Sequence, residues 1–205
     1  MPKNSIQFFG LPGSGKTFTL KSLLKAFPEY YKSVPNFSKL KRFWLFMLFV
    51  IRFPLISAKF FSLLFCNNFK LWKYIFHLVS VSFASQMYVL LQKEDGRRFL
   101  IDEGVYQRLL SVTPRRFSEK ESIKLVKYLN NLNSKVVVTS GGDFGRFLLE
   151  PDRMISHRNK LGDNYFKKWS EDLVFNFQLL SGALSSDNFI YERGKLEELH
   201  AKIQS

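Results

Sequence analysis

The sequence predicts a three-layer α/β fold, in which helices cover the two faces of a parallel sheet. Residues 5–9, 97–102 and 135–139 each contain a short, mostly apolar run of the kind found in buried parallel strands. Between them, apolar residues recur at helical spacing. With 205 residues, the chain is long enough for one domain, residues 1–205, with a sizeable core.

The first predicted strand leads into a glycine-rich stretch with a specific spacing. Gly10-Leu11-Pro12-Gly13-Ser14-Gly15-Lys16-Thr17 fits G-x-x-x-x-G-K-[ST], the phosphate-binding loop (P-loop, Walker A) of nucleoside triphosphate enzymes. Glycines let backbone N–H groups surround the β-phosphate, Lys16 can reach the β- and γ-phosphate oxygens, and Thr17 can ligate Mg²⁺. The motif predicts nucleotide binding. The following helix has an apolar face and ends at Pro28; that face consists of Leu20, Leu23, Leu24 and Phe27.

Residues 28–97 form a predicted helical, aromatic-rich insertion. Basic residues precede an apolar run at residues 43–51, which Arg52 and Pro54 interrupt. The run is too short for a membrane span, which takes about 20 apolar residues. Three interpretations remain open: core helices that cover the acceptor, an interfacial surface on an anionic membrane, or a partner-protein interface. Helical spacing also predicts another long helix over residues 69–91.

The strand at residues 97–102 ends in Asp102, followed by Glu103. A carboxylate at this position lies beside the phosphate loop and can orient the Mg²⁺ shell. We therefore expect Thr17 and Asp102 to form the metal site. Glu103 is either a general base or a partner that holds Arg108 or a backbone group.

Ser118 and Glu121 form a capping box, which predicts a helix through about Leu132. Its predicted inward face consists of Ile123, Val126 and Leu129. The strand at residues 135–139 follows, and residues 140–142 end it at the edge where ligands collect in open α/β sheets.

Residues 143–163 are polar and carry several arginines, which predicts either a mobile lid or a solvated basic loop. As a lid, this segment would bring cationic side chains to the γ-phosphate and exclude water. Arg153 and Arg158 are the expected lid residues. Beyond the lid, the pattern predicts a helix over residues 164–180, a strand over 188–192 and a helix over 196–203.

The charge balance points to an anionic partner, because the formal net charge is +14. A nucleoside triphosphate and an anionic membrane surface both fit; nucleic acid ranks below them. The single cysteine, Cys66, excludes an intrachain disulfide framework. The start of the sequence shows no secretory signal, so a cytoplasmic protein is expected, either free or peripheral to the inner face of the membrane.

The order of these elements resembles that of the nucleoside and nucleotide kinases among the P-loop proteins, such as thymidylate kinase. Three motifs carry the resemblance: residues 10–17, residues 99–103, and the pair Arg153 and Arg158. The resemblance implies a P-loop NTPase fold, an acceptor bound by residues 28–97, and a phosphate clamp from the two lid arginines.

The chain also departs from that group. The Asp-Arg pair of thymidylate kinases is Asp102-Glu103 here, and an acidic second strand is not evident unless residues 30–37 supply an edge strand. The insertion is more apolar than a nucleotide pocket. Small P-loop proteins with a similar Asp-Glu-Gly strand end are often encoded among bacterial surface-polysaccharide genes, so the resemblance extends to a sugar or lipid-linked glycan acceptor.

The resemblance implies an Mg-ATP-dependent kinase that transfers the γ-phosphoryl group to a hydroxyl or phosphate acceptor. Its catalytic residues would be Lys16, Asp102, Glu103, Arg153 and Arg158, with Asp102 or Glu103 as the base. ATP and Mg²⁺ are the expected cofactors. The alternative is a P-loop ATPase or GTPase that acts as a switch or motor, with Glu103 activating water.

Overall fold

A computed structural model describes residues 5–66, 71–93, 95–113, 115–140, 162–184, 189–192 and 195–204. It shows a mixed α/β fold around one parallel sheet of five strands, in the order β2-β3-β1-β4-β5. The strands are β1 (Ser5–Phe9), β2 (Tyr31–Ser33), β3 (Arg98–Ile101), β4 (Ser134–Ser140) and β5 (Phe189–Glu192). The parallel sheet predicted from the sequence is confirmed.

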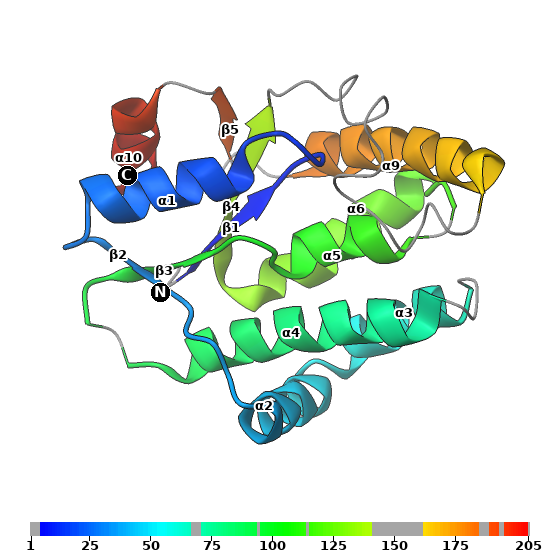
Figure 1. The fold of residues 1–205 in the computed structure, drawn as a ribbon, viewed down its shortest axis with the longest axis horizontal. Coiled ribbons are helices and arrows are strands. Elements are labelled where there is room, and N and C mark those ends of the chain that lie inside the picture. Colours follow the sequence, from blue (N-terminus) through cyan, green and yellow to red (C-terminus); the bar gives the residue numbers. More distant parts are fainter. Residues whose placement is uncertain are drawn as a thin grey trace.

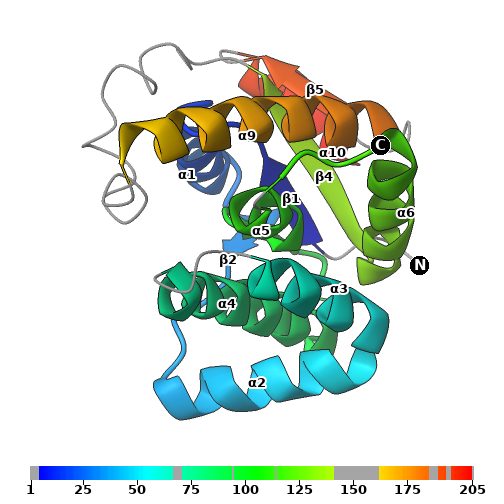
Figure 2. The same cartoon turned by 90° about the vertical axis from the view of Figure 1, so that its right-hand side faces the viewer.

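Helices cover both faces of the sheet, as Figures 1 and 2 show. α1 (Lys16–Ala26) and α10 (Leu196–Gln204) cover one face. The other face is covered by α4 (Trp72–Leu91), α5 (Val105–Val112), α6 (Glu119–Leu129) and α9 (Asp163–Ala183). A short 3₁₀ turn, η2 (Asn130–Leu132), follows α6. α2 (Lys39–Arg52) and α3 (Pro54–Phe65) form a further layer against α4.

β1, the central strand, has apolar side chains on both faces of the sheet, so helices pack on both faces. Along β1, Ile6 and Phe8 face α1 and α10, whereas Phe9 packs in the core with the helices of the other face. All five residues of β1 are buried. A strand buried on both faces is mostly apolar, as Ile6, Phe8 and Phe9 are here, and this composition marks the segment in the sequence.

A buried polar network fixes the helical insertion to the sheet. The Gln7 amide of β1 donates hydrogen bonds to Gln86 Oε1 of α4 (2.9 Å) and to Ser134 Oγ of β4 (3.1 Å). Gln86 in turn donates to the Leu132 carbonyl (2.8 Å). Because buried amides are costly to leave unpaired, this network holds α4 in a defined register on the sheet.

The apolar run after Lys39 folds into two helices with a sharp bend between them. α2 and α3 meet at an angle of 110° where Phe53 precedes Pro54. Within the described residues, α4 is long and apolar enough to cross a membrane, and the bent α2–α3 pair meets the same criterion when taken together. Half of the most apolar stretch of α4 is buried inside the protein. α4 is thus a helix of the core.

One detail differs from expectation. Ile123 does not face inward: it is 53% exposed, and Ser122, Leu125, Val126 and Leu129 form the buried face of α6. The reason is geometric. Consecutive residues of a helix lie about 100° apart, and Ser122 is part of the buried face, so Ile123 points away from the core. Residues 31–33 do form an edge strand, β2, and it carries no acidic side chain. The capping box at Ser118 and Glu121 is confirmed.

Candidate functional site

The Gly10–Thr17 loop follows the carboxyl end of the central strand and leads directly into α1. Gly13 and Gly15 have φ angles of 79° and 84°, a conformation that favours glycine. At Gly10, an added Cβ would overlap the Thr139 side chain of β4, so only glycine allows the loop to pass this close to the neighbouring strand. The glycines are thus required by the backbone path of the loop.

Lys16, the first residue of α1, folds back over this loop. Its Nζ donates hydrogen bonds to the carbonyls of Gly10 (2.9 Å) and Leu11 (2.8 Å). Burial lowers the pKa of Lys16 to about 8, an effect that the Asp102 carboxylate partly opposes. The first N–H groups of a helix have no acceptor within the helix. The N–H groups at the start of α1 and the Lys16 ammonium therefore lie at the same end of the loop. This arrangement is suited to an anion.

Thr17 and Asp102 meet at the mouth of the loop. The Thr17 hydroxyl donates a 2.6 Å hydrogen bond to Asp102 Oδ2. The other oxygen, Oδ1, is buried and has no hydrogen-bond partner in the described part of the chain. A hydroxyl and a carboxylate are hard oxygen donors of the kind that Mg²⁺ prefers, and the unpaired oxygen has a vacant coordination direction.

No group of three or more His, Cys, Asp or Glu side chains that could hold a metal occurs among the described residues. Mg²⁺ is often bound by only one or two protein oxygens, with water and substrate phosphates as the remaining ligands. Thr17 and Asp102 therefore fit a metal that arrives with a phosphate ligand, and do not fit an all-protein metal cage.

Glu103 is joined to Arg108 by an ion pair, and Arg108 is fixed from a second side. Its Nε donates to Ser82 Oγ of α4 (3.0 Å), and Ser82 donates to the Glu103 carbonyl (2.7 Å). The Arg108 side chain is only 5% exposed, whereas that of Glu103 is 55% exposed. Burial lowers the pKa of Arg108 to about 10, so the guanidinium stays charged at neutral pH. The sequence left two roles open for Glu103, a general base or a partner of Arg108. The structure shows the contact with Arg108.

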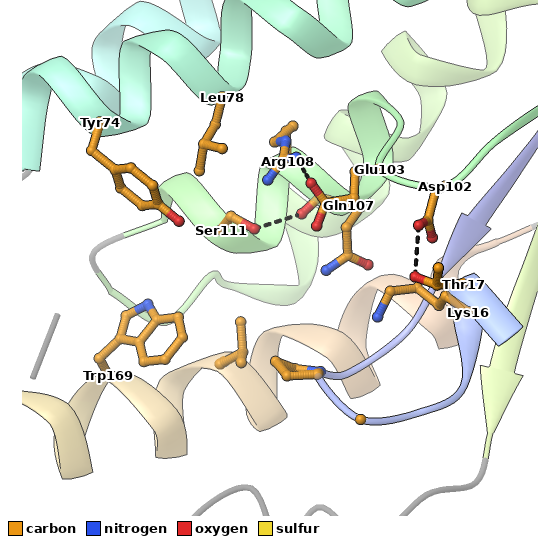
Figure 3. A pocket seen from close by; sticks show the side chains of 13 residues that line it. Lys16, Thr17, Tyr74, Leu78, Asp102, Glu103, Gln107, Arg108, Ser111 and Trp169 are labelled. Atoms are coloured by element: carbon orange, nitrogen blue, oxygen red, sulfur yellow. Dashed lines mark hydrogen bonds and ion pairs between the residues drawn. The ribbon is translucent and has the colours of Figure 1, made fainter. Parts of the chain in front are cut away.

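These side chains line one cavity of about 260 Å³, shown in Figure 3. Lys16, Thr17, Asp102 and Glu103 lie on one side of it, and Tyr74 of α4 faces them from the other side. α9 contributes apolar surface. The remaining lining residues are Pro12, Gly13, Leu78, Gln107, Arg108, Ser111, Trp169 and Leu173. The cavity has a charged half at the loop and an aromatic half between α4 and α9.

A second cavity of about 550 Å³ adjoins the first. The two share Asp102, Glu103 and Arg108, so these three residues form the wall between them. Residues 33–37, between β2 and α2, and Arg42 of α2 line the far side of the second cavity. Both cavities therefore take part of their walls from the segment 28–97.

The structure brings together three of the five catalytic residues expected from the sequence. Lys16, Asp102 and Glu103 line one cavity, and Thr17 joins them as the expected metal ligand. Arg153 and Arg158 lie outside the described residues. Of the expected lid at residues 143–163, the structure describes only residues 162–163, at the start of α9.

Sequence reasoning missed several residues of this site. Gln107 accepts a hydrogen bond from the Gly10 N–H (3.1 Å) and so positions the start of the loop. Arg108 places a buried cation in the cavity, although the sequence suggested it only as a partner of Glu103. A signal was available, since both residues lie in the first turn of α5, which begins three residues after Asp102. No sequence signal marked Tyr74 or Trp169, which reach the cavity through tertiary packing.

Comparison of the chain with protein-family models, with curated proteins and with solved structures gives no match.

Proposed function

We propose that the protein is an Mg-ATP-dependent kinase with a P-loop NTPase fold, which transfers the γ-phosphoryl group to an acceptor hydroxyl or phosphate. One observation carries the proposal: a single cavity is lined by the Lys16 ammonium, by the Thr17–Asp102 pair and by Glu103 with Arg108. Phosphoryl transfer depends mainly on positioning and on stabilising developing negative charge, and these groups supply both.

The triphosphate would lie along the Gly10–Thr17 loop, with its β-phosphate at the N-terminus of α1. To bind it, Lys16 exchanges the carbonyls of Gly10 and Leu11 for β- and γ-phosphate oxygens. The partly desolvated ammonium gains most from this exchange, because a charge in a low-dielectric site interacts strongly with an anion.

Thr17 and Asp102 would hold Mg²⁺ together with the phosphates, and the bound ion would neutralise charge on the β- and γ-phosphate oxygens. The Thr17 hydroxyl would offer the ion a lone pair and could keep donating its proton to Asp102, because a hydroxyl has one donor and two lone pairs. Asp102 Oδ1, which has no hydrogen-bond partner among the described residues, would be available to the ion or to a water bound to it.

Arg108 supplies a fixed cation on the acceptor side of the cavity. Its contacts with Ser82 and Glu103 keep the guanidinium in place without any closing motion. Such a preorganised cation can stabilise the charge that develops on the transferring group. In this proposal Arg153 and Arg158 add a clamp from the lid.

The acceptor would reach the γ-phosphate through the aromatic half of the cavity, between α4 and α9. Its hydroxyl proton passes to Asp102 or Glu103 as the new P–O bond forms and the bond to ADP breaks. A nucleotide, a sugar and a lipid-linked glycan are the candidate acceptors. Aromatic walls and polar groups at the reacting end are compatible with each of them.

A second function has one observation in its favour. The Glu103 carboxylate is half exposed, so a water molecule can reach it as readily as an acceptor hydroxyl can. With Glu103 activating water, the protein would be a P-loop ATPase or GTPase that acts as a switch or motor.

ATP turnover with and without acceptors separates the two functions. The kinase consumes ATP slowly alone and rapidly with one class among nucleoside monophosphates, sugars and lipid-linked sugars, and it labels that acceptor with the γ-phosphate. Steady hydrolysis that no acceptor accelerates favours the switch. A folded wild-type protein that neither hydrolyses ATP nor transfers its γ-phosphate to any of these classes, and binds no nucleotide, contradicts both.

A further inference from the structure

α2 has two apolar faces, and only one of them is used in packing. Leu45, Phe46 and Phe49 are buried against the rest of the protein. The opposite face carries six large apolar side chains that are each 36% to 71% exposed, here named the outer stripe: Leu40, Phe43, Trp44, Met47, Leu48 and Ile51. Their spacing of three and four residues forms a continuous band along the helix. Large exposed apolar patches mark interaction sites.

The position of α2 leaves this stripe accessible. Figures 1 and 2 show α2 at the edge of the molecule farthest from the sheet, with α4 between α2 and the rest of the core. The helix has 14 residues and is about 20 Å long, and the stripe extends over most of it. Leu55, at the start of α3, is also 66% exposed and adds to the apolar surface beyond the bend.

The positive charge on α2 indicates which kind of partner covers the outer stripe. α2 itself carries four basic side chains and no Asp or Glu: Lys39, Lys41, Arg42 and Arg52. Lys39 and Arg52 are exposed at the two ends of α2 itself. A second copy of this chain would bring two like-charged surfaces together, and a nucleic acid backbone offers no apolar counterpart for six large side chains.

We infer that the outer stripe docks on an anionic membrane, with α2 lying in the plane of the interface. Apolar side chains enter the boundary between headgroups and acyl chains, and the basic residues remain at the level of the lipid phosphates. Trp44 is near the middle of the stripe, and tryptophan is enriched at this depth. α4 stays in the protein core, where Gln86 binds the sheet. This inference is independent of the proposed kinase activity.

Flotation of the full chain with vesicles tests the inference. We expect the protein to float with vesicles that contain phosphatidylglycerol, less with pure phosphatidylcholine, and less again at high salt. Trp44→Ser/Ile51→Ser should lower the partition coefficient by about tenfold or more, because two anchoring side chains are lost. Lys39→Gln/Arg52→Gln should lower it by about tenfold or more, since each basic residue contributes near an anionic surface.

The controls carry equal changes elsewhere. Leu91→Ser/Ile123→Ser removes two exposed apolar side chains, and Lys120→Gln/Lys168→Gln removes two exposed charges on α6 and α9. Both controls should float like the wild type. Tryptophan emission gives a second readout. Vesicles should shift the emission of the wild type to shorter wavelength. The conservative variant Trp44→Phe should lose most of that shift while it keeps the fold.

Three results would overturn the inference. One is a folded wild-type protein that does not float with phosphatidylglycerol vesicles and shows no emission shift. Another is equal loss of flotation in the control pairs. The third is a dimer that Trp44→Ser/Ile51→Ser dissociates while no variant binds vesicles, which would assign the stripe to a second copy.

Discussion

The Thr17 hydroxyl donates a 2.6 Å hydrogen bond to the Asp102 carboxylate, although 85 residues separate the two in the sequence. The pair exists because β1 and β3 are parallel neighbours, with Gln7 in register with Ile101, so the segments that follow the two strands emerge side by side. Two motifs that are separate in the sequence are thus one site in the fold.

Replacing Asp102 with Asn should abolish the magnesium dependence of nucleotide binding and lower phosphoryl transfer by about 100-fold or more. The amide keeps the shape of the side chain and can still accept from Thr17, but it removes the negative charge that a divalent cation needs. Titration of Mg²⁺ at fixed ATP measures the effect. Glu119→Gln, an exposed change at the start of α6, serves as the charge-matched control. Wild-type magnesium dependence in Asp102→Asn would remove Asp102 from the metal site.

Nucleotide affinity should decrease as the pH rises above about 8. Burial lowers the pKa of Lys16 to about 8 in the ligand-free protein, so the ammonium is charged below this pH and increasingly neutral above it. A triphosphate favours the charged form, so binding above about pH 8 takes up a proton, and affinity falls by up to about tenfold per pH unit.

Calorimetry in buffers of different ionisation enthalpy measures this proton uptake directly. Lys16→Arg keeps a positive charge throughout the range, since a guanidinium does not titrate there, and should show no such uptake. If the wild type and Lys16→Arg have the same pH profile, Lys16 does not bind the phosphates.

Arg108→Lys should lower the transfer rate with little loss of stability. Lysine retains the charge but cannot bond Ser82 and Glu103 in the forked geometry of the guanidinium, so both the cation and the Glu103 carboxylate lose their fixed positions. Steady-state kinetics should show a lower kcat and a higher KM for the acceptor, with the KM for ATP nearly unchanged. Arg115→Lys, in the exposed ion pair with Glu121, is the control. Equal kinetics in the two variants would make Arg108 a structural residue alone.

Gln86→Leu should destabilise the protein by about 3 kcal/mol, because it removes the Gln86 acceptor of the Gln7 amide, which keeps only Ser134, and the Gln86 donor to the Leu132 carbonyl. Denaturant unfolding gives the free energy. Gln178→Leu changes an exposed glutamine of α9 and should alter stability by less than about 0.5 kcal/mol. A loss of similar size in both variants would mean that the buried network does not hold α4 on the sheet.

Much of the fold could be predicted from the sequence, because its signals are local. The glycine-rich motif requires a strand before it and a helix after it, and both are present in β1 and α1. The capping box at Ser118 marks the start of α6 for the same reason: its two hydrogen bonds involve residues three apart. Ile123 was misplaced because spacing alone gives an apolar face without the direction of the core.

The remaining parts of the site depend on tertiary contacts and therefore left little trace in the sequence. Tyr74 reaches the cavity because α4 packs against the sheet and α5, with Gln86 and Ser82 among its contacts, and nothing near Tyr74 signals this. Trp169 reads as one more apolar residue of an amphipathic helix. The exposed side of α2 was equally hidden, since an unbroken apolar run does not reveal which of its residues are buried.

Calorimetric titration of Mg-ATP into the folded wild-type protein and into Lys16→Ala tests the central claim most directly. We predict saturable binding at one site in the wild type, dependence on Mg²⁺, and loss of binding in Lys16→Ala with the fold intact. A folded wild-type protein that binds neither Mg-ATP nor Mg-GTP would contradict the account.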